Sequence, residues 1–287
     1  RELFSFYEMP PNGQGIVALM ALNIVRGFDL KSVGYGTVDY WHLLIEAIKL
    51  AFADGRAYVG DPRTSPAPLA EMLSEDYAAE RRAQISTTKT QIFGPGEPYS
   101  SGDTVYLTVA DRFGNMVSWI QSLYEDFGSG ITDPQTGVQL QNRAANFTLE
   151  SGHPNQVAPG KRPYHTIIPG FITQNNQPWC SFGVMGGFMQ PQGHLQVGLN
   201  LTEFGMDPQS ALDAPRFRWI KDNIVAFEDG VPESVLGELK QRGHEVITPE
   251  PGETFSFGGG QVILRDADSG VLIGGSEPRK DGAAIGW

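Results

Sequence analysis

Apolar residues recur at helical spacing in the upstream third of the chain. Residues 13–27 carry a wide apolar face, and residues 39–58 repeat apolar side chains every three or four positions. Asp39 is the expected N-cap of the second helix, because its carboxylate can accept hydrogen bonds from free backbone N–H groups. A short polar helix is expected over residues 74–85. Residues 86–103, rich in Thr, Gly and Pro, predict an exposed linker.

After residue 103 the pattern changes to strand-like alternation. Residues 104–110 and 116–121 flank a five-residue segment that contains Gly and Asn and predicts a hairpin turn. Alternate residues of the first strand should face opposite sides, so that Tyr106 and Thr108 lie on one face. A second hairpin is expected from residues 166–173 and 179–184.

The rest of the chain mixes the two patterns. Helices are expected near residues 193–204, 208–213 and 232–242, and strands near 216–227, 245–248, 260–265 and 271–274. Strands and helices in a mixed order indicate an α+β fold rather than an alternating parallel sheet.

Composition narrows the classes of partner. The chain has 287 residues and a formal net charge of −12, which argues against nucleic acid and anionic membranes as partners. No run of 18 apolar residues predicts a membrane span. The single cysteine, Cys180, excludes an internal disulfide framework and a cysteine-based zinc site. No pair of histidines has metal-ligand spacing with a carboxylate, so we predict no metal, and no cofactor motif is present.

Thr104 is the main candidate for chemistry. It opens the first alternating run and directly follows Ser100-Ser101-Gly102-Asp103. A cut between Asp103 and Thr104 would give Thr104 a free α-amine beside its own hydroxyl. Such an amine has a pKa of about 7.7–8.0 and can accept the hydroxyl proton near neutral pH. One cleavage would therefore create a nucleophile and its base in one residue.

Several ordered motifs give the chain a family resemblance. It resembles the γ-glutamyltransferase (γ-glutamyltranspeptidase) family over nearly its whole length. The motifs that carry the resemblance are Thr104–Asn115, Phe127–Ile131, Leu140–Phe147, Pro159–Pro163, Gly186-Gly187, Ala211–Arg216 and Ser276–Trp287, with Met9-Pro10-Pro11 and Tyr58–Pro62 upstream. The resemblance implies a four-layer αββα sandwich of the N-terminal nucleophile hydrolase type. It also implies a precursor that cuts itself before Thr104.

The resemblance assigns further roles. Gly186 and Gly187 match the family's oxyanion pair, and Ser122 stands where the family has a second threonine that supports the nucleophile. Residues 1–103 correspond to the C-terminal part of the large subunit, and residues 104–287 to the small catalytic subunit. The two would form part of one αββα domain. The N-terminal portion of the large subunit would then be a partner absent from this chain.

Substrate-binding positions depart from the family pattern. Tyr124 replaces an Asn, Arg143 a Gln, Asn146 an Asp, and His165-Thr166 two serines. The acidic partner for a substrate α-ammonium is lost with Asn146, whereas Arg143 adds a positive charge. Charge alone therefore favours an acyl group with a carboxylate and no α-amine, such as a glutaryl group.

The main hypothesis is a self-processing amidohydrolase or acyltransferase whose acyl-enzyme is released to water or an amine. Two alternatives stay open: an authentic γ-glutamyl hydrolase or transpeptidase acting on glutathione-like substrates, and an uncleaved pseudoenzyme or binding protein. The expected partner is a small-molecule amide or γ-glutamyl substrate. The sequence leaves a homo-oligomer open and does not distinguish cytoplasmic from secreted or periplasmic localisation.

Overall fold

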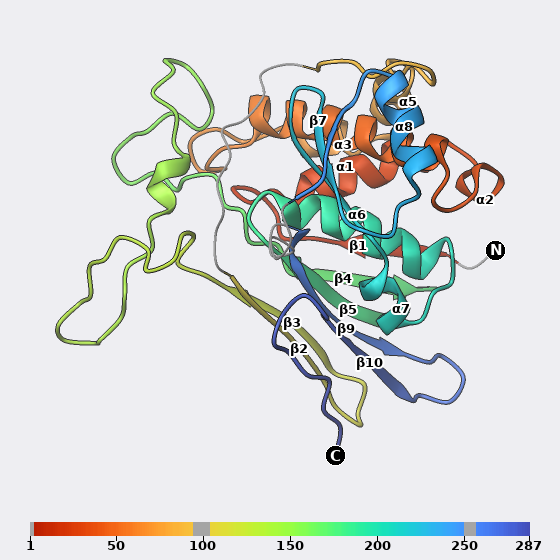
Figure 1. Ribbon diagram of the computed structural model, residues 1–287. Coiled ribbons are helices and arrows are strands. Elements are labelled where there is room, and N and C mark those ends of the chain that lie inside the picture. The colour runs from red at the N-terminus through yellow and green to blue at the C-terminus, as the bar shows by residue number, and fades with distance from the viewer. Residues whose placement is uncertain (1–2, 94–103, 250–256) are drawn as a thin grey trace.

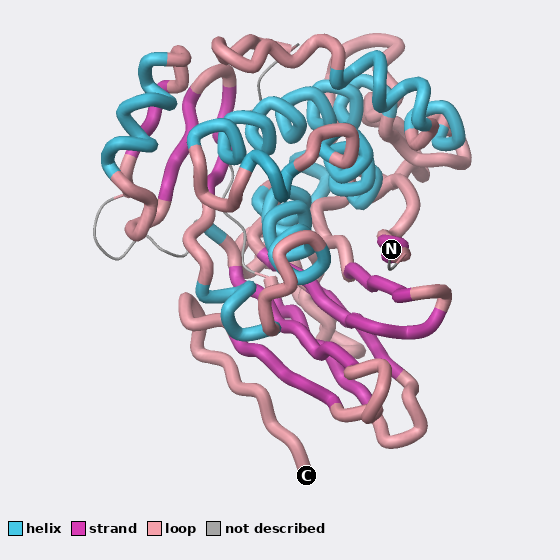
Figure 2. The backbone as a smooth tube through the Cα atoms, turned by 90° about the vertical axis from the view of Figure 1, so that its right-hand side faces the viewer, coloured by secondary structure: helices cyan, strands magenta, loops and turns pink. Residues whose placement is uncertain are grey.

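The computed structural model describes residues 3–93, 104–249 and 257–287. Three layers are stacked in it: helices, a five-stranded sheet, and a two-stranded hairpin (Figures 1 and 2). Asp103, the residue before the expected cleavage site, lies outside the described residues. The α+β class expected from the sequence is confirmed.

The helical layer contains the long helices predicted from apolar periodicity. They are α1 (Gly15–Val25), α3 (Val38–Tyr58) and α6 (Met189–Thr202), and α1 packs against both others. The expected N-cap of α3 was wrong. Thr37 occupies that position and its hydroxyl accepts from the Tyr40 N–H at 3.2 Å, whereas Asp39 lies in the first turn. Helix α5 (Glu75–Arg82) begins after Ser74, close to the expected short helix.

The central sheet is antiparallel in the order β1-β4-β5-β9-β10. Its strands are β1 (Phe4–Tyr7), β4 (Gly170–Gln174), β5 (Gln177–Met185), β9 (Gly259–Arg265) and β10 (Leu272–Ser276). Strand β1 was not expected, since residues 1–85 read as mostly helical. Strand β4 begins four residues later than expected, because residues 163–169 are irregular and only His165 makes a bridge, to Gly13.

The third layer is the hairpin of β2 (Val105–Ala110) and β3 (Met116–Gln121), which packs on β5 and β9. Its alternation is as predicted: Tyr106 is buried against the sheet. The opposite face of the hairpin is apolar and exposed, and its residues are Val105, Leu107, Val109, Val117 and Trp119.

Shorter elements complete the fold. A small sheet in the order β6-β7-β8 lies beside α3 with α8. The bounds are β6 (Phe217–Lys221), β7 (Ile224–Phe227), β8 (Glu245–Ile247), α2 (Leu30–Val33), α4 (Leu69–Met72), α7 (Pro208–Asp213), α8 (Glu233–Gln241) and the 3-10 helix η1 (Arg143–Asn146). Within the described ranges, no helix combines the length and apolarity needed to cross a membrane.

The described part of the expected linker is attached to the helical layer. The Thr90 hydroxyl and the Gln91 backbone N–H both donate to the buried carboxylate of Glu46, at 2.8 and 3.0 Å. Residues 86–93 are therefore attached to α3, and most of them are exposed, as the sequence predicts for a linker.

Candidate active site

Thr104 and Ser122 lie at the same end of the β2–β3 hairpin. Val105 pairs with Gln121 in the antiparallel register, so Thr104 and Ser122 each stand one residue outside a paired strand end. Both line a groove of about 1740 Å³, together with Met185 at the end of β5. The register thus brings the two predicted hydroxyl residues to one site, beside the strand that leads into Gly186.

Gly186 and Gly187 form the turn between β5 and α6. Their φ angles are +129° and +59°, which favour glycine at both positions. The Met189 N–H donates to the Gly186 carbonyl at 3.0 Å. Because the C=O and N–H of a trans peptide point in opposite directions, the Gly187 N–H points away from α6. No hydrogen bond among the described residues uses this N–H as a donor. A developing oxyanion needs a free, fixed donor of this kind.

Arg143 lies at the centre of a second group of predicted residues, which we call the Arg143 cluster: Ser122, Tyr124, Arg143 and Thr166. Its Nη1 donates to the Thr166 hydroxyl at 2.8 Å, and its Nη2 donates to the Ser122 hydroxyl. The guanidinium carbon lies 5.4 Å from the centre of the Tyr124 ring. Four predicted site residues therefore meet in one cluster.

The guanidinium of Arg143 is a buried cation. Arg143 is only 1% exposed, and burial lowers its pKa to about 10, which leaves it charged at neutral pH. No described Asp or Glu forms an ion pair with it; the Tyr124 side chain is the one group that favours its charged form. Buried charges are normally paired, so the cluster is suited to receiving an anion.

Asn146 and His165 are bonded to nearby backbone instead of joining this cluster. Asn146 Nδ2 donates to the Tyr164 carbonyl at 3.1 Å. His165 Nδ1 lies 2.8 Å from the Pro163 carbonyl oxygen. Burial lowers the pKa of His165, and the charge of Arg143 lowers it further. The structure therefore gives these two residues contacts that shape the segment around Tyr164.

Comparison with known proteins gives this arrangement a family. The family model described as gamma-glutamyltranspeptidase matches residues 3–287, almost the entire chain. The chain belongs to the gamma-glutamyltranspeptidase family. The resemblance inferred from the motifs is thereby confirmed.

Three relatives illustrate the range of named activities in this family. The chain is 35% identical to the glutathione hydrolase-like YwrD proenzyme of Bacillus subtilis over 99% of its own length and 54% of that protein. It is 33% identical to the acylase ACY 1 proenzyme of Pseudomonas sp. strain V22, over 96% of this chain and 49% of that one. The crystal structure of cephalosporin acylase from Bacillus halodurans superposes with a TM-score of 0.90 and 50% identity, covering 99% of this chain and 51% of that one. The chain thus spans about half the length of these gamma-glutamyltranspeptidase relatives.

Two residues at the site were missed by the sequence analysis. Gly258 has a φ of +80°, and a Cβ there would lie 2.4 Å from the Met185 carbonyl oxygen. It also lies against Gly186, whose own Cβ would meet the Gly258 Cα at 3.0 Å. The sequence analysis gives no role to the run Gly258–Gly260. No sequence pattern indicates a role for Gln14, because the residues that it contacts, Thr166 and Gly187, are far away in the sequence.

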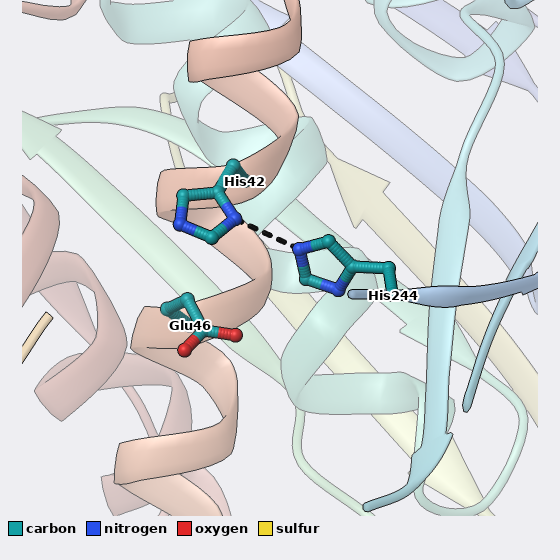
Figure 3. A group of neighbouring side chains, drawn as sticks. All are labelled: His42, Glu46 and His244. Carbon is teal, nitrogen blue, oxygen red and sulfur yellow. Dashed lines mark hydrogen bonds between the residues drawn. The ribbon is translucent and has the colours of Figure 1, made fainter. Parts of the chain in front are cut away.

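A group of possible metal ligands lies on the far side of the helical layer from the hairpin. His42 and Glu46 are one turn apart on α3, and His244 precedes β8; one ligand atom from each lies within 4.8 Å of the others (Figure 3). No pair of histidines shows metal-ligand spacing with a carboxylate along the sequence, but the fold brings His42 and His244, 202 positions apart, together beside Glu46. A spacing of four residues places two side chains on the same face of a helix.

Most polar atoms of this group already have hydrogen-bond partners, although His244 Nδ1 has none among the described residues. Glu46 Oε1 accepts from Lys49 Nζ at 2.8 Å. His42 Nε2 lies 2.7 Å from the Ser86 carbonyl, which leaves Nδ1 to face His244 Nε2 at 2.8 Å. Burial, together with the charges of His42, Lys49 and Arg242, lowers the pKa of His244 to about 3. The Lys49 ammonium would repel a bound cation. We therefore assign the group to the packing of α3 against the segment around His244.

Proposed function

We propose that this chain is the catalytic part of a self-processing amidohydrolase or acyltransferase in which Thr104 is the nucleophile. The observation that carries the proposal is the placement of Thr104 beside Ser122 in a groove that reaches the end of β5, next to the Gly186-Gly187 turn. Thr104 Oγ1 attacks an amide carbonyl while its α-amine takes the hydroxyl proton. The Gly186 and Gly187 N–H groups stabilise the oxyanion.

The acyl-enzyme then forms as the amide C–N bond breaks and the leaving amine takes the proton. Water or another amine attacks the ester carbonyl and restores the Thr104 hydroxyl. In the precursor, the same hydroxyl attacks the carbonyl carbon of Asp103, and the peptide C–N bond breaks to release the Thr104 amine and leave an ester. Water then hydrolyses this ester, which separates the two pieces and restores the Thr104 hydroxyl. The naming of the relatives as proenzymes supports this order of events.

The Arg143 cluster is our basis for proposing the substrate class. A buried cation without a described acidic partner favours an acyl group that ends in a carboxylate. A glutaryl-type side chain meets this requirement, and the naming of two relatives as acylases is consistent with it. Tyr124 and Thr166 would shape the pocket around Arg143, and Asn146 and His165 would support its wall.

The subunit arrangement belongs to the same proposal. Residues 1–103 would form the end of the large subunit and residues 104–287 the small subunit, within one αββα sandwich. The exposed apolar face of β2 and β3 supports a fourth layer, because five large apolar side chains on one face normally pack against another element. We assign that cover to the half of the relatives' length that this chain does not span.

Processing of the full-length protein that contains this sequence tests the proposal. Intact mass and a denaturing gel should show two pieces separated before Thr104, and Thr104→Ala should leave one piece. The processed protein should hydrolyse glutaryl anilides better than γ-glutamyl anilides. Faster turnover of γ-glutamyl anilides would favour a γ-glutamyl hydrolase or transpeptidase instead. A protein that stays whole after long incubation would support the non-enzymatic alternative.

A further inference from the structure

One side-chain amide connects the two halves of the candidate site. Gln14 is fully buried, and its Nε2 donates to the Gly187 carbonyl at 2.9 Å and to the Thr166 carbonyl at 2.7 Å. An amide nitrogen has two N–H donors, so both are used. Gly187 belongs to the oxyanion turn, and Thr166 accepts a hydrogen bond from Arg143. The Gln14 amide therefore lies between the expected site of bond cleavage and the cation.

The backbone of Gln14 is held separately from its side chain. Its N–H donates to the His165 carbonyl at 3.0 Å, and its carbonyl accepts from the Val17 N–H in the first turn of α1. These main-chain bonds do not depend on the side chain. A substitution at this position therefore removes the two side-chain bonds while the main-chain bonds that start α1 are retained.

The Gly187 carbonyl accepts two hydrogen bonds, one from the Gln190 N–H at 3.2 Å and one from Gln14 Nε2. Glycine has no Cβ and populates many backbone conformations, so the side-chain bond adds a restraint to the one that the helix supplies. The bond from Gln14 restrains the Gly187 carbonyl and with it the backbone that carries the candidate oxyanion donor. The second bond restrains the residue that contacts Arg143.

We propose that Gln14 is a positioning residue that sets the spacing between the oxyanion turn and the Arg143 guanidinium. That spacing selects the length of the carboxylate-bearing acyl chain. The proposal rests on the function proposed above. Gln14 precedes the expected cleavage site, whereas Thr166 and Gly187 follow it, so the amide would also join the two processed pieces.

Two substitutions in the processed full-length protein test this role. Gln14→Met keeps the length of the side chain and removes both donors. We expect kcat for a glutaryl anilide to fall roughly ten- to hundredfold, with less effect on KM. The preference for glutaryl over succinyl and adipyl anilides should become weaker, because the spacing is no longer fixed.

Gln14→Glu gives a pH signature that a loss of packing would not give. Its carboxylate would face two carbonyl oxygens and repel them, whereas the protonated form can donate one hydrogen bond. The ratio of variant to wild-type kcat should therefore rise at least severalfold as the pH falls from 8 to 5. Taking this ratio cancels the titration of the Thr104 amine, which the two proteins share.

Gln196 is the matched control. It is also buried, and its Nε2 donates to two backbone carbonyls, those of Gln192 and Phe217, both at 3.0 Å. Gln196→Glu should lower the melting temperature without changing the pH ratio or the chain-length preference. The proposal is overturned when a cleaved Gln14→Met protein keeps wild-type kcat and chain-length preference, or when both Glu variants show the same pH ratio. A wild-type protein that is uncut, or inactive on all the anilides, overturns the proposed function and this inference together.

Discussion

Arg143 donates a hydrogen bond from its guanidinium to the hydroxyl of Ser122, the residue next to Thr104 in the hairpin register. A buried cation thus contacts a hydroxyl residue that stands at the same end of the hairpin as the candidate nucleophile. The same hydroxyl accepts from the Tyr124 N–H at 3.0 Å. In this arrangement, the group that would recognise the acyl carboxylate also orients a residue at the reacting end of the site.

Arg143→Met should lower activity toward acyl groups that carry a carboxylate. Hydrogen bonds to charged groups contribute about 1.5–3 kcal/mol, so kcat/KM for a glutaryl anilide should fall roughly ten- to hundredfold. A valeryl anilide, which lacks the carboxylate, should be much less affected. Steady-state kinetics on both substrates measure the ratio. An unchanged ratio of glutaryl to valeryl activity would contradict a role for Arg143 in binding the carboxylate.

Ser122→Ala should slow turnover by about tenfold, because Arg143 and the Tyr124 N–H lose a buried acceptor. Ser122→Thr is the control, since it keeps the hydroxyl at the same position. We expect its kcat to stay within about threefold of wild type, in line with the energy of a retained hydrogen bond. Equal losses in the two variants would show that the volume of the side chain, and not its hydroxyl, is what matters.

Gly258→Ala should distort the Gly186-Gly187 turn, which we propose as the oxyanion site and which packs against Gly258. The new Cβ would lie 2.4 Å from the Met185 carbonyl, which precedes Gly186, and the φ of +80° adds strain. Gly152→Ala is the control that separates backbone strain from the steric clash. Gly152 has a similar φ of +82°, but a Cβ there would have open space around it. Gly152→Ala should cost about 1 kcal/mol of unfolding free energy and leave kcat unchanged. Gly258→Ala should cost more and lower kcat; a wild-type kcat would contradict the proposed support of the turn.

Glu277 should stabilise the fold in a pH-dependent way. It is buried, and its Oε2 accepts from Arg216 at 2.8 Å and from the Gly260 N–H at 2.7 Å. Burial opposes ionisation, but the charges of Arg216 and Arg279 outweigh it and lower the pKa of Glu277. A lowered carboxyl pKa gives stability above the unfolded-state value of 4.5, which is lost as the pH falls through the folded-state pKa.

Glu277→Gln should therefore lower the free energy of unfolding by roughly 3 kcal/mol at pH 7, because buried arginine charge loses its partner. The difference from wild type should shrink as the pH falls below 4.5. Denaturant titrations at several pH values measure it. A difference that stays constant with pH would mean that Glu277 contributes through its shape and hydrogen bonds alone.

The group of His42, Glu46 and His244 should not respond to metal ions. Zn²⁺ or Co²⁺ added to the full-length protein should leave its melting temperature unchanged, because Lys49 already neutralises Glu46. A metal-dependent rise in melting temperature that His42→Asn abolishes would contradict this assignment.

Local patterns in the sequence predicted most helices and strands, and they failed where a distant partner decides the structure. Strand β1 has four residues and pairs with β4, with Phe4 opposite Gln174. A run that short has no clear periodicity of its own. The N-cap of α3 was misplaced by two residues, because both Thr37 and Asp39 can cap a helix and only the backbone geometry selects between them.

The sequence by itself determined where helix gives way to strand, that Thr104 opens the hairpin, and which family the motifs match. These properties depend on neighbouring residues and their order. Only the tertiary structure decided that Arg143 meets Ser122 and Thr166, and that Gln14 reaches Gly187 across 173 positions of the chain. Such contacts depend on how the hairpin, the sheet and α1 pack together. Burial then makes the Arg143 cation and the Gln14 amide important, because buried polar groups need partners, and their positions in the sequence do not reveal this.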